Sequence, residues 1–196
     1  MREIFALANR KDFFVLPTDR LLLRVVRRKA AHDVTEYLIK NRAFHKPFHQ
    51  YQPEEYFTRY EQSLYISSDL RAFQKGERCS FWISTKKNPK RIMGRLSFSV
   101  IVRGAMSSCL AGYHLDEEET GKAYMREALQ AGCEYMFTRQ GLHRIQADVM
   151  PHNTPSIHCV ESCGFKKQGL NERYMCIDGK WQDHYCYAKI NPHTSI

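Results

Sequence analysis

The stretch that decides the fold is LAGYHLDEEETGKAYMREALQAGCEYMFTRQGLHRIQADVMPHNTPSIHCVESCGF, which runs from Leu110 to Phe165. Its pattern predicts strand, tight turn, helix, strand, turn and helix, with Gly164 closing the second helix. Two helix starts, at Gly121 and Asn153, therefore meet the ends of two strands. Because helix starts carry unpaired N–H groups and a positive dipole end, they attract phosphate and polarised carbonyl groups. The stretch predicts a site for a cofactor with a nucleotide tail.

Periodicity within this stretch supports each element. The helix predicted over 121–139 carries an apolar stripe at a spacing of about 3.6 residues, formed by Met125, Ala128, Leu129, Gly132 and Met136. Residues 143–149 alternate between apolar and polar, which is typical of a half-buried strand. Asn153 is a good N-cap and Pro155 suits a first turn, so the last helix is predicted over about 154–163.

The rest of the chain divides into shorter elements. A strand is predicted over 21–26 and a helix over about 29–40, followed by a basic, aromatic loop over 41–53. Pro53 and two acids open a second helix that runs to about 73. Further strands are predicted over 80–85, 92–102, 108–115, 173–177 and 181–188, the last two joined around Asp178-Gly179. The expected fold is α/β (α+β), with a mixed, mostly antiparallel central sheet of about six or seven strands and helices on both faces.

Bulk properties narrow the setting. The chain has 196 residues, which favours a single domain, here placed over 15–192 after an N-terminal extension over 1–14. Its formal charge is +9, which suits an acidic partner such as a phosphorylated cofactor, RNA or an RNA-bound protein, although general surface bias gives the same charge. The sequence has neither a secretory signal nor an apolar run of membrane-spanning length. We expect a cytoplasmic protein without membrane contact.

Seven cysteines are present, and most fall in apolar patterns. The odd count and the absence of CxxC spacing favour free, reduced thiols. Cys159 and Cys163 lie one helical turn apart beside His158, but no second ligand pair with suitable spacing accompanies them. No metal is expected.

Three strings carry a resemblance to a known family: GYHLDEEETGKAYMREAL, GLHRIQADVMPHNTPSIHCVESCGFKKQG and IDGKWQDHYCY. They resemble the GCN5-related N-acetyltransferases (GNAT), and within them the RimJ/RimL type that acetylates the N-termini of ribosomal proteins. Residues 110–190 carry this resemblance, whereas residues 16–110 resemble the family only in layout. The resemblance implies a GNAT fold, acetyl-CoA as co-substrate and transfer of an acetyl group.

The resemblance also implies where acetyl-CoA binds. The family's phosphate loop corresponds to Thr120-Gly121-Lys122-Ala123-Tyr124-Met125, with departures at Thr120, Ala123 and Met125. We expect Ala123 to adopt helical dihedrals, Thr120 to cap the helix, Lys122 to add charge near phosphate and Met125 to point into the core. The backbone N–H near Leu115 holds the thioester carbonyl in this scheme, and Asn153 contacts the pantetheine arm. From the residues alone, Asn153 is simply an N-cap.

The catalytic residues are implied by the same resemblance. Ser156 matches a serine that protonates the leaving thiolate, although a hydroxyl in a first turn also satisfies backbone N–H groups. Glu172 matches the family's late glutamate as general base, and His114 and His184 are further candidates for that role.

The acceptor is left open between three hypotheses. The leading one is the α-amino group of a protein N-terminus. The resemblance implies that the aromatic, basic segment RAFHKPFHQY at 42–51 contacts this acceptor. The second is a small amine such as a polyamine, amino sugar or antibiotic, and the third is a non-catalytic CoA-binding or ribosome-associated module. Contact with the ribosome or RNA through the basic surface fits the first and third. The sequence allows a monomer or a homodimer.

Overall fold

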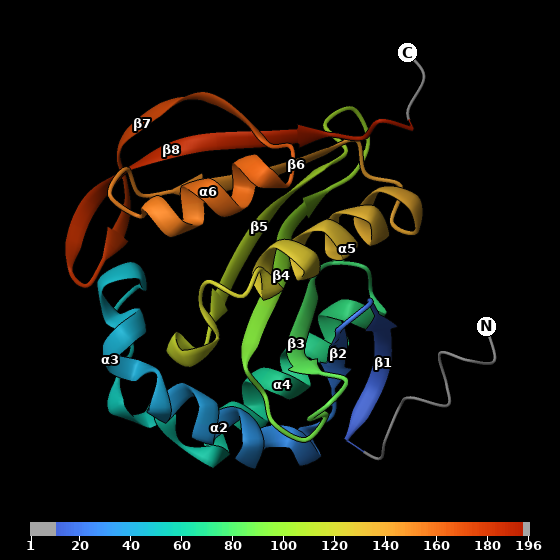
Figure 1. Cartoon of the computed structure of the whole chain (residues 1–196), viewed down its shortest axis with the longest axis vertical. Coiled ribbons are helices and arrows are strands. Elements are labelled where there is room, and N and C mark those ends of the chain that lie inside the picture. Colours follow the sequence, from blue (N-terminus) through green and yellow to red (C-terminus); the bar gives the residue numbers. More distant parts are fainter. Residues whose placement is uncertain (1–10, 194–196) are drawn as a thin grey trace.

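The structure, a computed structural model, describes residues 11–193 and contains one eight-stranded sheet. The strand order is β1-β2-β3-β4-β5-β6-β8-β7, and every neighbouring pair is antiparallel except β5 and β6. In Figure 1, α5 and α6 lie across the front of the sheet, while α2, α3 and α4 are grouped at the bottom of the view. The expected mixed, mostly antiparallel sheet with helices is confirmed, with one strand more than the upper estimate.

The N-terminal half supplies four strands and the helices at the bottom of Figure 1. Its elements are β1 (Asp12–Pro17), β2 (Leu21–Val26), η1 (Arg28–Ala30), α2 (Ala31–Lys40), α3 (Arg42–His45), η2 (Lys46–Phe48), η3 (Glu54–Phe57), α4 (Arg59–Gln74), β3 (Cys79–Thr85) and β4 (Gly94–Val102). The additional strand is β1, which begins inside the predicted N-terminal extension, so Asp12–Phe14 belong to the sheet. Residues 1–10 of that extension lie outside the described residues.

The C-terminal half carries the stretch that decides the fold and the final hairpin. Its elements are β5 (Ser108–Leu115), η4 (Glu117–Glu119), α5 (Tyr124–Thr138), β6 (Arg144–Val149), α6 (Thr154–Ser162), β7 (Lys166–Ile177) and β8 (Lys180–Ile190). Asp178 and Gly179 both have positive φ, 44° and 78°, as a two-residue hairpin turn requires. None of the helices between residues 11 and 193 combines the length and apolarity needed to span a bilayer.

Three helix boundaries differ from the sequence prediction. The predicted loop over 41–53 contains α3 and η2, and the predicted helix over 53–73 is interrupted at Thr58, whose side chain caps α4. The helix expected from Gly121 begins at Tyr124 instead, because Ala123 has left-handed dihedrals, φ 59° and ψ 18°. Ala123 is thus the N-cap of α5 and outside its regular helical geometry.

Each face of the sheet has its own buried cluster. The larger cluster lies under α5 and α6 and includes Met125, Leu129 and Tyr187, which confirms that Met125 points into the core. The smaller cluster joins α2 and α4 to the opposite face through Val26, Val34 and Trp82. Burying these side chains removes apolar surface from water at about 25 cal/mol per Å², which fixes both helical layers on the sheet.

Gly132 brings α5 close to β4. A Cβ atom at this position would lie 2.6 Å from Leu96 Cδ2 and 2.9 Å from ring atoms of Phe98, and both side chains are fully buried. Glycine here is therefore a packing requirement.

We expect Gly132→Ala to lower the free energy of unfolding by about 1 kcal/mol. Overpacking costs about 1–3 kcal/mol, of which the better helix propensity of alanine offsets about 1 kcal/mol. Gly169→Ala is the matched control, since nothing lies within 4 Å of a Cβ there, and it should change stability by less than about 0.5 kcal/mol. Equal urea midpoints for the two variants would contradict the packing argument.

Candidate active site

The site begins where β5 and β6 separate. The two strands pair in parallel only from Ser108 to Leu110, and beyond that point their edges diverge. The N–H of Asp116 donates to the carbonyl of Met93 on the β4 side at 2.7 Å. Because successive residues of a strand direct their peptide groups to opposite sides, the peptide groups of Tyr113 and Leu115 face the gap. Their N–H groups are therefore available to a bound carbonyl.

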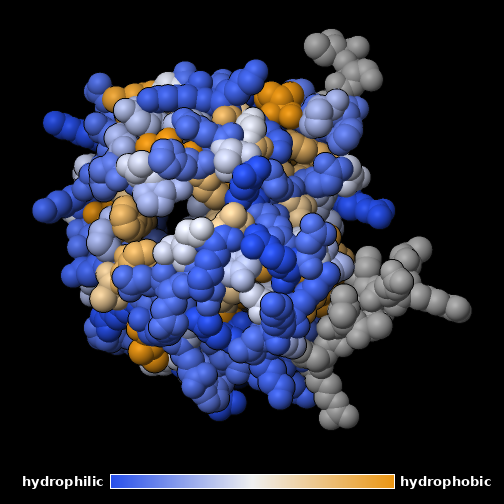
Figure 2. Space-filling model, viewed as in Figure 1, coloured by the Kyte–Doolittle hydropathy of each residue, from blue (hydrophilic) through white to orange (hydrophobic). Residues whose placement is uncertain are grey.

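A cavity of about 1100 Å³ fills this gap. Figure 2 shows a hollow left of centre, where Figure 1 places α6 above and the connection between β5 and α5 below. The cavity is lined from both faces of the sheet. Its walls include Phe44, His45, Phe48, His49, Tyr113, His114, Leu115, Thr120, Gly121, Ala123, Tyr124, Met125, Arg126, Asp148, Asn153, Ser156, Cys159, Met175 and His184. Of the predicted site residues, Lys122 and Glu172 do not line it.

The half of the cavity that the sequence predicts for the cofactor, called here the cofactor half, is bordered by the turn before α5. Ala123 provides no side-chain hydrogen bond as N-cap, so the N–H groups of the first turn have no side-chain partner. Gly121 has φ 75° and nothing lies within 4 Å of a Cβ position there, which leaves room for an anionic group. The left-handed conformation of Ala123 costs about 1–2 kcal/mol relative to the right-handed region. The expectation of comfortable helical dihedrals at Ala123 is wrong.

The charges beside this turn also differ from the expectation. Lys122 Nζ pairs with Glu119 Oε2 at 2.9 Å, so its charge is held by a carboxylate. Thr120 donates from Oγ1 to the carbonyl of Glu117 at 2.8 Å and ends η4 without capping α5. Arg126, in the first turn of α5, lines the cavity and brings the positive charge that the sequence suggested for Lys122.

The start of α6 forms the wall opposite this turn. Asn153 caps α6 by accepting a hydrogen bond from the N–H of Ser156 at 3.2 Å, as predicted. The Ser156 hydroxyl lies 2.8 Å from the phenol oxygen of Tyr113, which also donates to the Ser156 carbonyl at 3.2 Å. Burial raises the pKa of Tyr113 well above its ordinary value, so the phenol is neutral and retains its proton. Tyr113 is a polar partner of Ser156 that the sequence analysis missed.

The half of the cavity that is expected to receive the acceptor, called here the acceptor half, lies on the other face of β5 and contains three imidazoles. His45 Nε2 donates to the Leu115 carbonyl at 2.8 Å, and His114 Nδ1 lies 2.7 Å from the Tyr37 hydroxyl. The ring centroids of His45, His49 and His114 are 4.9–5.2 Å apart. Burial is the main cause that lowers the pKa of all three, to about 4 for His49 and well below the ordinary value for His114. The cluster is neutral at pH 7.

Asp148 is the only acid among the described residues that line the cavity. Gln146 Nε2 donates to both of its carboxylate oxygens, at 3.0 Å each. Burial raises the pKa of Asp148, an effect that Gln146 and His184 partly oppose. His184 is buried at the cavity wall, and its Nδ1 donates to the Gln182 carbonyl at 3.0 Å. Glu172 lies exposed on β7, away from these residues.

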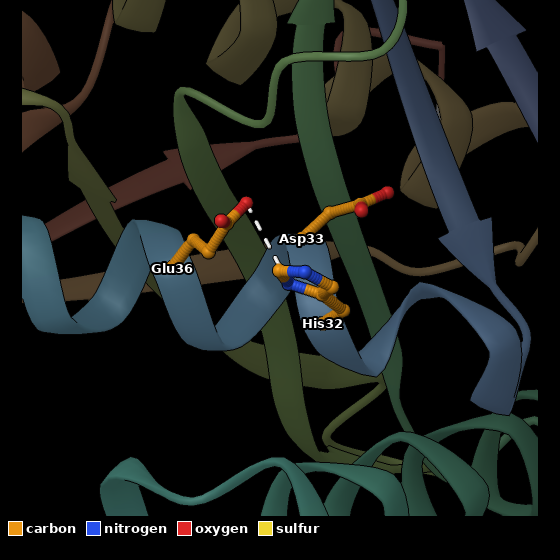
Figure 3. A group of neighbouring side chains, drawn as sticks. All are labelled: His32, Asp33 and Glu36. Carbon is orange, nitrogen blue, oxygen red and sulfur yellow. Dashed lines mark ion pairs between the residues drawn. The ribbon is translucent and has the colours of Figure 1, made fainter.

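Among residues 11–193, one further group of side chains has metal-binding donors, namely His32, Asp33 and Glu36 on α2. Figure 3 shows His32 paired with Glu36, at 3.6 Å, and one ligand atom from each of the three side chains lies within 4.8 Å of the others. Asp33 is engaged by Lys11 Nζ at 2.6 Å. Because the group is largely exposed and its members already have partners, it forms ordinary surface ion pairs.

A family model described as an acetyltransferase (GNAT) domain matches residues 20–166. The chain belongs to the GNAT acetyltransferase family. It is 35% identical over 179 residues to [ribosomal protein uS5]-alanine N-acetyltransferase of Escherichia coli, a match that covers 90% of this chain and 91% of the relative.

Two solved structures extend the comparison. Ribosomal-protein-S5-alanine acetyltransferase from Vibrio fischeri has a TM-score of 0.88 and 27% identity, and the match covers 94% of this acetyltransferase and 100% of that chain. Mycobacterium smegmatis RimJ in complex with CoA-disulfide has a TM-score of 0.84 and 27% identity, with 90% and 86% covered. The predicted family and fold class are confirmed.

Some of the site residues that the sequence prediction did not name for this acetyltransferase could have been inferred from sequence patterns. Alternation in the strand over 143–149 places Asp148 opposite the apolar side chains, so a carboxylate beside the gap was detectable. His45 and His49 belong to the segment predicted to contact the acceptor, and both line the cavity. The pairing of Tyr113 with Ser156 joins residues 43 positions apart and left no local signal.

The contact between Ser156 and Tyr113 generates a prediction for this acetyltransferase. On the hypothesis that Ser156 protonates the leaving thiolate, Ser156→Ala should lower kcat by roughly ten- to a thousandfold with little change in cofactor affinity. Tyr113→Phe keeps the serine hydroxyl and should lower kcat less. Steady-state kinetics and calorimetry measure both quantities, and an unchanged kcat in Ser156→Ala would reduce the serine to a residue of the helix start.

Proposed function

We propose that this enzyme transfers an acetyl group from acetyl-CoA to the α-amino group of a protein N-terminus, and that the acceptor is a ribosomal protein. The Escherichia coli relative that matches nine-tenths of the chain is named [ribosomal protein uS5]-alanine N-acetyltransferase. The observation that carries the proposal is a cavity that passes through the sheet, with anion-binding backbone on one face and a single acid on the other.

The cofactor half fits acetyl-CoA. The unpaired N–H groups at the start of α5 and the charge of Arg126 suit the phosphates, since such groups bind anions without rearrangement. The open edge of β5 offers N–H groups to the amide-containing arm, and Asn153 and Ser156 border the same space. The structure of Mycobacterium smegmatis RimJ with CoA-disulfide supports this assignment for a protein of the same fold.

The acceptor half favours one cationic amine over a polyamine. A polyamine carries several positive charges and calls for several carboxylates, whereas Asp148 is the only acid among the described lining residues. The three imidazoles are neutral and do not repel an ammonium group. Phe44, Phe48 and Met175 supply apolar surface for the first side chain of a peptide.

The reaction requires an ammonium group to lose two protons, one before the new bond forms and one after it, and the thiolate to gain one. Asp148 is placed to accept the proton from the ammonium group, after which the amine nitrogen forms a bond to the carbonyl carbon. The N–H groups of Tyr113 and Leu115 stabilise the charge that develops on the carbonyl oxygen. The C–S bond breaks and Ser156 gives its proton to sulfur, while the second proton leaves the attacking nitrogen and restores the Ser156 hydroxyl. Holding both substrates in one cavity supplies much of the rate.

Asp148 suits the role of base better than two of the candidates named from the sequence, His114 and Glu172. His114 has a pKa well below its ordinary value, which makes it a weak base, and one of its nitrogens is engaged by Tyr37. Glu172 is exposed outside the cavity. Because the pKa of Asp148 is raised, it lies closer to the pKa of the amine, which favours proton transfer.

The charge of +9 supports contact with RNA when the acceptor is presented on a ribosomal particle. A free ribosomal protein is itself basic and would be repelled, whereas phosphates attract lysine and arginine.

The proposed function is tested with a panel of peptides that differ only at the N-terminus. Peptides with a free N-terminal alanine or serine should be acetylated, and the same peptides with a blocked N-terminus but an internal lysine should remain unmodified, as mass spectrometry reports. If spermidine or an amino sugar is acetylated and none of the peptides is, the acceptor is a small amine and the proposal is wrong.

Asp148→Asn should lower kcat/KM for the accepted peptide by about a hundredfold, the usual size of a general-base contribution. On the acid side, the wild-type profile should show two ionisations, of the substrate amine and of Asp148, because protonation removes the base as pH falls. The variant should show only that of the amine. The other titratable groups near Asp148 are the same in both proteins, so a difference between the two pH profiles reports on Asp148. These groups are His184 and Cys186 on β8, Tyr174 on β7 and the facing imidazoles.

Glu172→Gln is the matched comparison, since it makes the same change in an exposed carboxylate. A larger loss in Glu172→Gln than in Asp148→Asn would restore Glu172 as the base.

A further inference from the structure

A carboxylate in the first turn of α5 is held by the turn between β1 and β2, more than one hundred residues away in sequence. Thr18 Oγ1 and the backbone N–H of Arg20 donate to Glu127 Oε1, at 2.5 and 2.8 Å. Arg20 Nε donates to Glu127 Oε2 at 2.6 Å. Both carboxylate oxygens are therefore occupied. Burial would raise the pKa of Glu127, but hydrogen bonds from Thr18 and Arg20 outweigh it and lower the pKa.

The same arginine contacts the residues on both sides of Ala123. Arg20 Nη1 donates to the carbonyl of Lys122 at 3.1 Å. The Arg20 guanidinium carbon lies 4.6 Å from the centroid of the Tyr124 ring, a cation–π distance. Arg20 and Glu127 thus fix the entry to α5 from outside the cavity, since neither lines it.

The hydrogen bond to Lys122 has a directional consequence. In a trans peptide the carbonyl and the following N–H point in opposite directions. Because Arg20 draws the Lys122 carbonyl outward, the N–H of Ala123 is turned the other way. Gly121, Ala123 and Tyr124 line the cavity, whereas Lys122 does not, which agrees with this orientation.

Ala123 is a position that requires such support. Its left-handed backbone is strained for alanine, and strained conformations persist where surrounding contacts determine them. Glycine adopts the same dihedrals without strain. The contacts of Arg20 with Lys122 and Tyr124 enclose this residue.

We propose that Arg20 and Glu127 are positioning residues that hold the strained Ala123 turn in the geometry that directs backbone N–H groups at the phosphates of CoA. The proposal rests on the proposed function, because it assigns CoA to this turn. It predicts that the need for Arg20 depends on the residue at 123.

The test is a double-mutant cycle with CoA affinity as the readout. Arg20→Ala should raise the Kd for CoA by about tenfold, which corresponds to about 1.4 kcal/mol, with the KM for the acceptor peptide unchanged. In the Ala123→Gly background the same substitution should raise the Kd by about twofold or less, because glycine holds the turn unaided. Calorimetry measures the four Kd values, and thermal unfolding checks that each variant is folded.

Arg42→Ala is the matched control. Arg42 also bonds a carboxylate, Glu54, and lies over an aromatic ring, Phe57, at 4.4 Å, but it does not line the cavity or touch the turn. It should leave the Kd for CoA unchanged. If Arg20→Ala does not fold, Glu127→Gln replaces it, because it removes the charge that holds Arg20 while keeping the side-chain shape.

The outcomes separate the two proposals. Absence of CoA binding by the unsubstituted protein would overturn the proposed function and this inference with it. Binding that Arg20→Ala and Glu127→Gln leave unchanged would overturn this inference alone. If Arg20→Ala raises the Kd equally whether residue 123 is alanine or glycine, the inference is also overturned, because the effect of Arg20 would then not act through Ala123.

Discussion

The parallel contact of β5 with β6, which lasts for only three residue pairs, is the constraint on which the rest of the site depends. Where the strands part, the backbone of β5 keeps hydrogen-bonding groups without a partner strand, and such groups need partners when they are enclosed. His45 satisfies one of them, the Leu115 carbonyl. The remaining N–H groups, with the uncapped start of α5, leave a gap whose chemistry suits an amide-containing arm with a phosphorylated end.

Local sequence signals predicted the elements that depend on local physics. Asn153 was recognisable as an N-cap, Met125 as part of an apolar stripe, and Asp178-Gly179 as a hairpin turn. The conformation of Ala123 was not predictable, because it is linked to contacts from Arg20, about one hundred residues away. The role of Lys122 was missed for a local reason, because its charge is paired with Glu119 only three residues earlier, at the end of the short helix η4. Pairings between distant residues, such as Tyr113 with Ser156, require the topology first.

Burial determines the charges in the acceptor half. Three histidines would ordinarily titrate near neutrality, but enclosure beside one another lowers their pKa values and leaves them uncharged. Asp148 experiences the same enclosure with the opposite result, a raised pKa. Removal of water thus makes the three imidazoles weaker bases than usual and the Asp148 carboxylate a stronger base than usual. Together they suit a single amine that must be deprotonated before it reacts.

The passage of the cavity through the sheet also determines how substrates can enter and leave. Side chains that border the cofactor half, such as Ser156, lie on the face covered by α5 and α6, whereas His114 and His49 lie on the face of α2 and α3. In the proposed function, donor and acceptor therefore approach from opposite sides. A folded or particle-bound acceptor that blocks one mouth leaves the other free, so spent CoA can be exchanged without release of a bulky partner, and acceptor size is not limited by the width of the sheet.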